Sequence, residues 1–331
     1  MSSIAVNAIV DANSGNTATI NGTTPTGPSL QGFRNRLFNG SYAVAQRGTT
    51  FASGSNNDDT YNLDRWYVLS DGNDAVDITQ NTAAAPPEQK FCIALDVETA
   101  NKKFGVAQII ENINCADLQG QTVTLSFQAK VSATTKLDNV KCAIVAWSGT
   151  ADSVTSDIIS AWGAEGTNPT LIANATYENS PANLNVTTDW ETYTVSAPID
   201  TASTNNVIVF IWSDVTDTTA GDFLYLAGVQ LEAGAVATPF ERRPYGTELA
   251  LCQRYFEKIG MVVLTTVATN YQGGYWAVSK RAIPTLTISF PAGGGATVAP
   301  FSTGYGELSG VYQSNPNSGD SNSLVTGSAE L

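Results

Sequence analysis

The stretch "FLYLAGVQLEAGAVATPFERRPYGTELALCQRYFEK", residues 223–258, decides how this chain folds. Its first part alternates apolar residues in the manner of a β-strand, and its last part has the spacing of a short helix. Between them, Glu241, Arg242 and Arg243 stand side by side next to Pro244. Only 14% of the residues are charged, so this charged turn between a strand and a helix requires a physical explanation.

Strand patterns dominate the chain before this stretch. Runs of alternating residues separated by Gly, Asn, Pro and Asp predict an all-β sandwich over residues 33–241. The clearest runs are "QTVTLSFQAKV" (121–131), "NVKCAIVAW" (139–147), "DWETYTVSAPI" (189–199) and "NVIVFIWSD" (206–214). Residues 150–186 interrupt the pattern and are expected to form a long loop with one short strand.

After the sandwich we expect a joint with one short helix over residues 242–260. The helix is predicted near 247–258, because Leu249, Cys252, Phe256 and Ile259 fall on one face and Thr247 can cap its start. Residues 261–331 contain further strand-like runs, such as "MVVLTTVAT" and "PTLTISF", and predict a smaller C-terminal β-domain.

Residues 1–32 differ from the rest in having one strand-like run followed by many Gly, Thr, Asn and Ser residues. Such a segment has too few large apolar side chains to bury a core of its own. We expect an extended arm that becomes ordered by adding a strand to a partner's sheet. The alternative is a disordered tail.

The composition excludes several classes of protein. Thirty acidic against 16 basic residues give a formal charge of −14, which opposes binding to nucleic acid or to an anionic membrane surface. No histidine is present, so histidine-dependent nucleophile systems and histidine-containing zinc sites are impossible. No run approaches 18 apolar residues, so membrane insertion is not expected.

The four cysteines, at positions 92, 115, 142 and 252, stand in apolar surroundings without metal-ligand spacing. Buried free thiols are the first interpretation, and disulfides remain the alternative. The acidic turn with Asp58, Asp59 and Asp64 lacks the spacing of a calcium loop, so a solvated turn followed by a salt-bridged region at Asp64–Arg65 is favoured. We expect no metal and no cofactor.

Six aromatic residues are candidates for binding a glycan or receptor. An aromatic ring on the surface of a jelly roll can stack on the apolar face of a sugar. Trp147 is the first candidate, because Val140, Cys142 and Ile144 define the opposite, core-facing side of its strand. The alternative is packing within the core or between subunits. The complete set is Trp147, Trp162, Trp212, Tyr271, Tyr275 and Trp276.

The charged turn is interpreted as a rigid joint. Arg242 and Arg243 have forked donors that can hold carboxylates or backbone carbonyls of a neighbouring segment, and Phe240 can fill an apolar gap between sandwich and helix. In the alternative, both arginines are plain surface residues. Pairs of acids such as Asp222 and Glu232 could serve glycoside hydrolysis, but no motif marks any one pair as catalytic. We therefore expect that the protein is not an enzyme.

Several segments together resemble the tail fibre and tail-fibre-like proteins of tailed bacteriophages. They are "SIAVNAIVDANSGNTATING", "NRLFNGSYAVAQRG", "YNLDRWYV", "SKRAIPTLT", the terminal "AEL" and, most specifically, residues 221–258. The middle also resembles the jelly roll of carbohydrate-binding modules, in the order "LSFQAKV", "TTDWETYTV" and "FLYLAGVQLE".

The resemblance implies a structural protein of the virion tail, assembled in the host cytoplasm. It implies a homotrimer, contact with other tail proteins through residues 1–32, and a contribution to recognition of host-surface polysaccharide. Two alternatives stay open, namely a capsid decoration or head-fibre protein and a polysaccharide-degrading tailspike.

Overall fold

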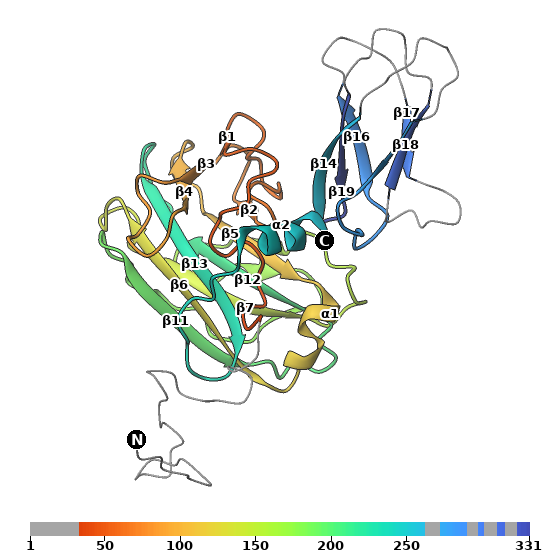
Figure 1. Cartoon of the computed structure of the whole chain (residues 1–331). Coiled ribbons are helices and arrows are strands. Elements are labelled where there is room, and N and C mark those ends of the chain that lie inside the picture. The colour runs from red at the N-terminus through yellow and green to blue at the C-terminus, as the bar shows by residue number, and fades with distance from the viewer. Residues whose placement is uncertain (1–32, 262–271, 290–296, 301–309, 315–322) are drawn as a thin grey trace, which may run out of the picture.

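The computed structural model describes residues 33–261, 272–289, 297–300, 310–314 and 323–331, and these ranges form a β-sandwich joined to a smaller β-unit (Figure 1). The predicted arm, residues 1–32, and Tyr271 lie outside the described residues. No helix in the described ranges is long and apolar enough to cross a bilayer.

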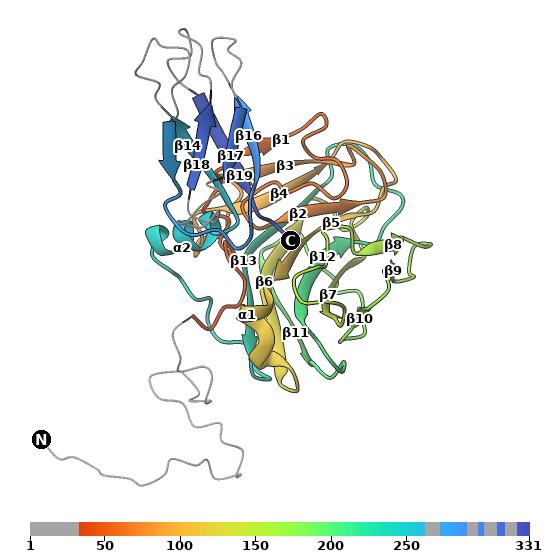
Figure 2. The same ribbon diagram turned by 90° about the vertical axis from the view of Figure 1, so that its right-hand side faces the viewer.

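The first sheet of the sandwich has six strands in the order β1-β3-β4-β13-β6-β11, and every neighbouring pair is antiparallel. Its strands are β1 (Thr50–Phe51), β3 (Val76–Asn81), β4 (Cys92–Val97), β6 (Thr122–Val131), β11 (Glu191–Pro198) and β13 (Phe223–Ala233). We call this sheet the outer sheet, and its second face uncovered, because no other sheet of the described residues packs on that face in Figures 1 and 2.

The second sheet has five strands in the order β10-β7-β12-β5-β2, again antiparallel. Its strands are β2 (Tyr67–Ser70), β5 (Phe104–Ile110), β7 (Val140–Trp147), β10 (Ala175–Tyr177) and β12 (Asn206–Ser213). From β4 to β13 the chain crosses between the sheets at every step except within the insertion, which confirms the predicted jelly-roll sandwich. A short helix, α1 (Asn112–Cys115), and a 3₁₀ turn (Ala116–Leu118) connect β5 to β6.

The main hydrophobic core fills the space between the two sheets. Alternate residues of each strand point into it, for example Leu224 and Leu226 of β13 and Val209 and Ile211 of β12, all fully buried. The four cysteines are buried and unpaired. Burial raises the pKa of Cys92, Cys115 and Cys142 to about 12, so these thiols are held in their neutral form.

A second hydrophobic cluster covers the other face of the five-stranded sheet. The covering layer is formed by the insertion at residues 150–186, which contains β8 (Ile159–Ala161) and β9 (Thr170–Leu171) and also supplies β10, the edge strand of the sheet, rather than the single strand expected. All residues of β7 and β12 are therefore buried, as in a sheet covered on both sides.

Two buried lysines fasten the insertion to the sheet. The Asp214 carboxylate lies 2.6 Å from Lys103 Nζ and 2.7 Å from Lys141 Nζ, and all three side chains are buried. Lys103 also donates to the carbonyl of Ala164 at 2.8 Å, and the Gly166 amide donates to Asp214 at 2.9 Å. A buried charge of this kind is stable only when such partners surround it.

The predicted helix is shorter than the sequence suggested. Helix α2 spans Tyr245–Gln253 and begins directly after Pro244, so Thr247 lies inside it and does not cap its start. Phe256 and Ile259 belong instead to β14 (Phe256–Met261), whose pairing with β19 (Ser323–Ser328) overrides the helical spacing.

The smaller β-unit therefore begins at Phe256, earlier than the expected residue 261. It contains a three-stranded sheet, β14-β19-β16, and a second one, β15-β18-β17. The remaining strands are β15 (Gln272–Tyr275), β16 (Thr285–Ser289), β17 (Thr297–Pro300) and β18 (Gly310–Ser314).

The last residues return to the sandwich. Glu330 forms ion pairs with Arg47 and Arg65, and Leu331 joins the second hydrophobic cluster. Arg65 is thus paired with Glu330 and not with Asp64, which instead accepts hydrogen bonds from Gln46. These contacts tie the smaller unit to the sandwich next to α2.

Candidate functional site

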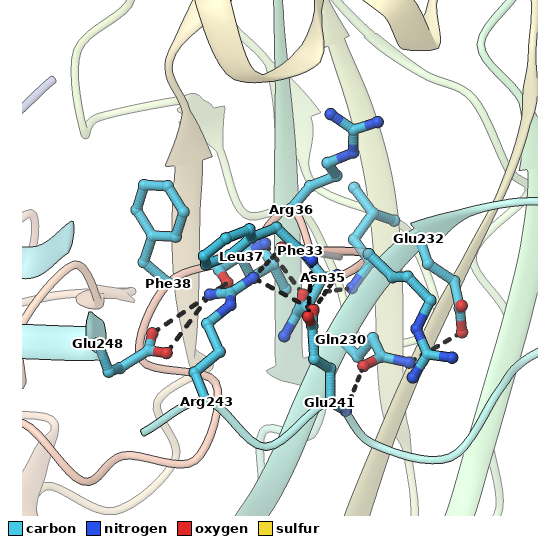
Figure 3. A network of polar contacts seen from close by, with 12 residues as sticks. Phe33, Asn35, Arg36, Leu37, Phe38, Gln230, Glu232, Glu241, Arg243 and Glu248 are labelled. Atoms are coloured by element: carbon cyan, nitrogen blue, oxygen red, sulfur yellow. Dashed lines mark hydrogen bonds and ion pairs between the residues drawn. The ribbon is translucent and has the colours of Figure 1, made fainter. Parts of the chain in front are cut away.

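The charged joint stands at the exit of β13, beside the segment 33–40 that leads into the sandwich (Figure 3). The two segments lie together because the Arg36 amide donates to the Leu231 carbonyl at 2.8 Å and the Val229 amide to the Gly40 carbonyl at 2.9 Å. The chain thus enters the fold alongside the strand by which it leaves the sandwich.

Two carboxylates of the joint accept backbone amides of this lead-in segment. Glu241 accepts the amide of Phe33 at 2.8 Å and the amide of Asn35 at 2.7 Å. Glu248, on α2, accepts the amide of Asn39. These amides have no strand ladder to donate to, so the carboxylates supply their acceptors, which matters most for Asn35 and Asn39 because both residues are buried.

Arg243 connects the two carboxylates. Its guanidinium lies 3.5 Å from Glu241 and 3.4 Å from Glu248, and it donates to the carbonyls of Asn35 and Leu37. Only 4% of its side chain is exposed. Figure 3 shows the guanidinium between the two carboxylates. A planar fork with several donors is the side chain suited to this combination of carboxylates and carbonyls.

The two neighbouring arginines differ in burial and in contacts. Arg242 is exposed, and its one hydrogen bond to a described residue reaches Gln89 Oε1 at 3.4 Å. Phe240 is half-buried and belongs to none of the hydrophobic clusters of the described residues, so it does not fill a core gap between sandwich and helix. It lines two cavities instead.

The aromatic candidates from the sequence are mostly buried. Trp147 is 8% exposed, Trp212 is fully buried and Trp276 is 6% exposed, so none of the three offers a ring face to solvent. Trp147 does leave the core side of its strand as expected, but the insertion covers it. Trp162 is half-buried within that covering layer. Tyr275, in the smaller unit, is 69% exposed.

Another aromatic group lies on the uncovered face of the outer sheet. Phe223 and Tyr225 alternate with the core residues of β13, so their rings point away from the core. These two rings stack with centroids 5.4 Å apart, and Trp190 meets Tyr225 edge-on at 6.4 Å. All three residues are half-buried. We call Trp190, Phe223 and Tyr225 the outer-face aromatic cluster.

Neighbouring groups hold this cluster in place. Trp190 Nε1 donates to the carbonyl of Ala84 at 2.8 Å. Lys130, paired with Tyr225 across β6 and β13, has its ammonium 5.0 Å from the Tyr225 ring centre and 5.3 Å from that of Trp190. Partial burial raises the pKa of Tyr225, so its hydroxyl remains protonated.

Two cavities lie on the outer sheet beside the joint, and Gln128 and Thr192, which line the first, stand two positions from Lys130 and Trp190 in the sequence. The sheet cavity, of about 480 Å³, lies between the strands and the joint and is lined by Gln128, Thr192, Gly228, Pro239, Phe240 and Arg242, among others. The joint cavity, of about 500 Å³, includes Lys90, Phe91, Phe240, Arg242, Arg243 and Tyr245. The two cavities share Gln89, Phe240 and Arg242.

Gly228 opens the floor of the sheet cavity. Its φ of +57° lies in the left-handed region, at the point where the register between β13 and β6 shifts. A Cβ atom here would lie 2.7 Å from Gln89 Nε2, so glycine permits the Gln89 side chain to rest against the strand.

The sequence contained a usable signal for this site. In "DFLYLAGVQLE", two aromatic residues occupy the non-core positions of a strand, where polar residues are usual. The aromatic candidates named from the sequence all lie outside the outer sheet, so none of them belongs to this cluster. Trp190 gives no such signal, because its position beside Tyr225 depends on the pairing of β11 with β6 and of β6 with β13.

The described residues bring together no group of three or more acidic or cysteine side chains suited to a metal ion. Asp222 and Glu232 lie ten positions apart along one extended segment, which separates them by roughly 30 Å at about 3.3 Å per residue. Glycoside hydrolysis needs two carboxyl groups within about 10 Å, so these two acids do not form a catalytic pair.

Comparisons with known proteins gave matches only among solved structures. No family model matches the chain, and no curated protein does. A tailspike protein 4 domain of bacteriophage CBA120 aligns with 62% of this chain and 22% of its own, at 14% identity and a TM-score of 0.35. A CBM4 structure aligns with 59% of this chain and 98% of its own, at 13% identity and a TM-score of 0.32.

A structure of carbohydrate-binding modules from the β-sandwich superfamily aligns over 57% of this chain and 63% of its own, at 11% identity and a TM-score of 0.35. The chain thus matches about a fifth of the length of the tailspike domain. Identities and TM-scores this low carry no argument about activity.

The two adjacent arginines provide a matched test of the joint. Replacing Arg243 with Met removes the shared partner of two largely buried carboxylates and of two carbonyls, so we expect the free energy of unfolding to fall by about 3–5 kcal/mol. Replacing the exposed Arg242 with Met should change it by less than about 0.5 kcal/mol. Urea denaturation of both variants measures the difference, and equal values would show that the joint does not depend on Arg243.

Proposed function

We propose that this chain is a structural protein of a bacteriophage virion, a tail fibre that contributes to recognition of a host-surface glycan. The observation that carries the binding role is the outer-face aromatic cluster, which lies beside Lys130 on the uncovered face of the outer sheet. The virion role is supported by the resemblance of the sequence segments, most of all residues 221–258, to tail fibre proteins.

The outer face has the groups that a sugar needs. Partly exposed rings of Trp190 and Tyr225 can contact the apolar C–H face of a pyranose. The sheet cavity that follows is lined by the side-chain amides of Gln89 and Gln128 and the hydroxyl of Thr192, which can exchange hydrogen bonds with sugar hydroxyls. Rings and hydrogen-bonding groups thus follow one another along the sheet.

The proposal assigns binding without catalysis. The acids singled out by the sequence do not form a pair, and Glu88 is the single acidic residue among those that line the two cavities, whereas glycoside hydrolysis uses two. We further propose that residues 1–32 attach the protein to other tail proteins and that three copies assemble. Both statements are supported by the sequence resemblance alone.

Substitution on the two aromatic surfaces tests the binding site. Trp190→Ala and Tyr225→Ala each remove a stacking ring, so binding to an array of bacterial surface glycans should fall by at least about tenfold. Tyr275→Ala, which removes an exposed ring of the smaller unit, should bind like the unaltered protein. Absence of any glycan binding by the unaltered protein, or full binding by Trp190→Ala, would contradict the assignment.

Labelling of intact particles tests the virion role. Gold-conjugated antibodies against residues 33–331 should decorate the tails of purified phage in negative-stain micrographs. Label on the capsid would instead support a head-fibre or decoration protein. Label on neither would contradict the virion role altogether.

A further inference from the structure

The joint cavity concentrates positive charge in an acidic protein. The chain has 16 basic and 30 acidic residues, yet Lys90, Arg242 and Arg243 all line this one cavity of about 500 Å³. Among the described residues that line it, none is acidic. Its walls are aromatic, formed by Phe91, Phe240 and Tyr245.

The three cations of the joint cavity differ in the interactions that they make within the protein. The guanidinium of Arg243 is engaged by the joint, but its Nε is buried and has no hydrogen-bond partner among the described residues. Arg242 and Lys90 are exposed. Arg242 makes one long hydrogen bond, to Gln89, and the Lys90 ammonium lies 5.3 Å from the ring centre of Phe91. Two cations are thus free to turn toward a ligand at the cavity.

The combination of cations and aromatic walls selects a class of ligand. A guanidinium binds a carboxylate through two parallel hydrogen bonds, and an ammonium adds a point charge. Aromatic walls favour a partner with an apolar ring face as well as a charge. A sugar ring that bears a carboxylate, such as a uronate or a sialate, has both features.

The cavity is also continuous with the proposed glycan site. It shares Gln89, Phe240 and Arg242 with the sheet cavity, which contains Gln128 on the same face of β6 as Lys130. Lys130 lies against the aromatic cluster. The two cavities and the aromatic cluster thus form one track along the outer sheet, with cations at both ends and Glu88 as the single acidic residue among those that line its cavities.

We infer that the joint cavity binds the carboxylate of an acidic sugar, so that the ligand of the outer sheet is an acidic polysaccharide. This inference rests on the proposed glycan-binding function and specifies its ligand class. Arg242 and Lys90 at one end of the track, and Lys130 at the other end, bind carboxylates of the polysaccharide. The aromatic rings contact the faces of its sugars.

Paired ligands test the inference. The full chain is titrated with uronate- and sialate-containing oligosaccharides and with the same oligosaccharides after reduction of each carboxylate to an alcohol. We expect at least about tenfold tighter binding of the acidic forms, and a steep loss of this preference as the sodium chloride concentration rises.

Two variants test whether the joint cavity causes the preference for acidic oligosaccharides. Arg242→Gln and Lys90→Gln change exposed side chains, so both should fold, and each should lower binding of the acidic forms by about tenfold while binding of the reduced forms stays the same. Lys136→Gln removes a partly exposed cation paired with Asp217. This control variant should bind the acidic and the reduced oligosaccharides as the unaltered protein does.

The outcomes separate this inference from the proposed function. Equal binding of acidic and reduced forms, or variants that bind the acidic forms as well as the unaltered protein does, would overturn the acidic ligand and leave glycan binding intact. Equal loss of both forms in Arg242→Gln would also overturn it. If no oligosaccharide of either form binds, the proposed function fails with it.

Discussion

The buried contact of Arg243 with Glu241 and Glu248 is the constraint on which the arrangement of this chain depends. It fixes the exit from β13 against the lead-in segment 33–40 and against the start of α2. Charge is scarce in this sequence, and here it is used where three segments must be held together without a ladder of backbone hydrogen bonds. This explains why adjacent charged residues stand between two prolines.

The same contact shapes the surface. Because residues 237–243 are held against the outer sheet, Phe240 and Arg242 form a common wall of the two cavities. The insertion at residues 150–186 covers the free face of the five-stranded sheet. Binding is consequently assigned to the outer sheet, where rings, amides and cations follow each other. A structural joint and a recognition surface are thus built from the same short segment.

The sequence predicted the fold class well and the site poorly, for physical reasons. Alternation identified β6, β7, β11, β12 and β13, because each has a face that must enter the core. Periodicity could not show what covers the other face, so the sequence left both a glycan-binding and a packing role open for Trp147, and in the structure the insertion buries its ring. Phe256 fits a helical face but pairs with Ser328, more than 70 positions away, and that pairing determines its structure.

The most direct test of the joint is hydrogen exchange at single amides, measured by NMR on the full chain. The amides of Phe33, Asn35 and Asn39 should exchange slowly, because carboxylates accept all three. In Glu241→Ala, Phe33 and Asn35 should lose protection while Asn39, held by Glu248, keeps it. Exchange of all three amides at the rate of an unfolded peptide in the unaltered protein would contradict the account.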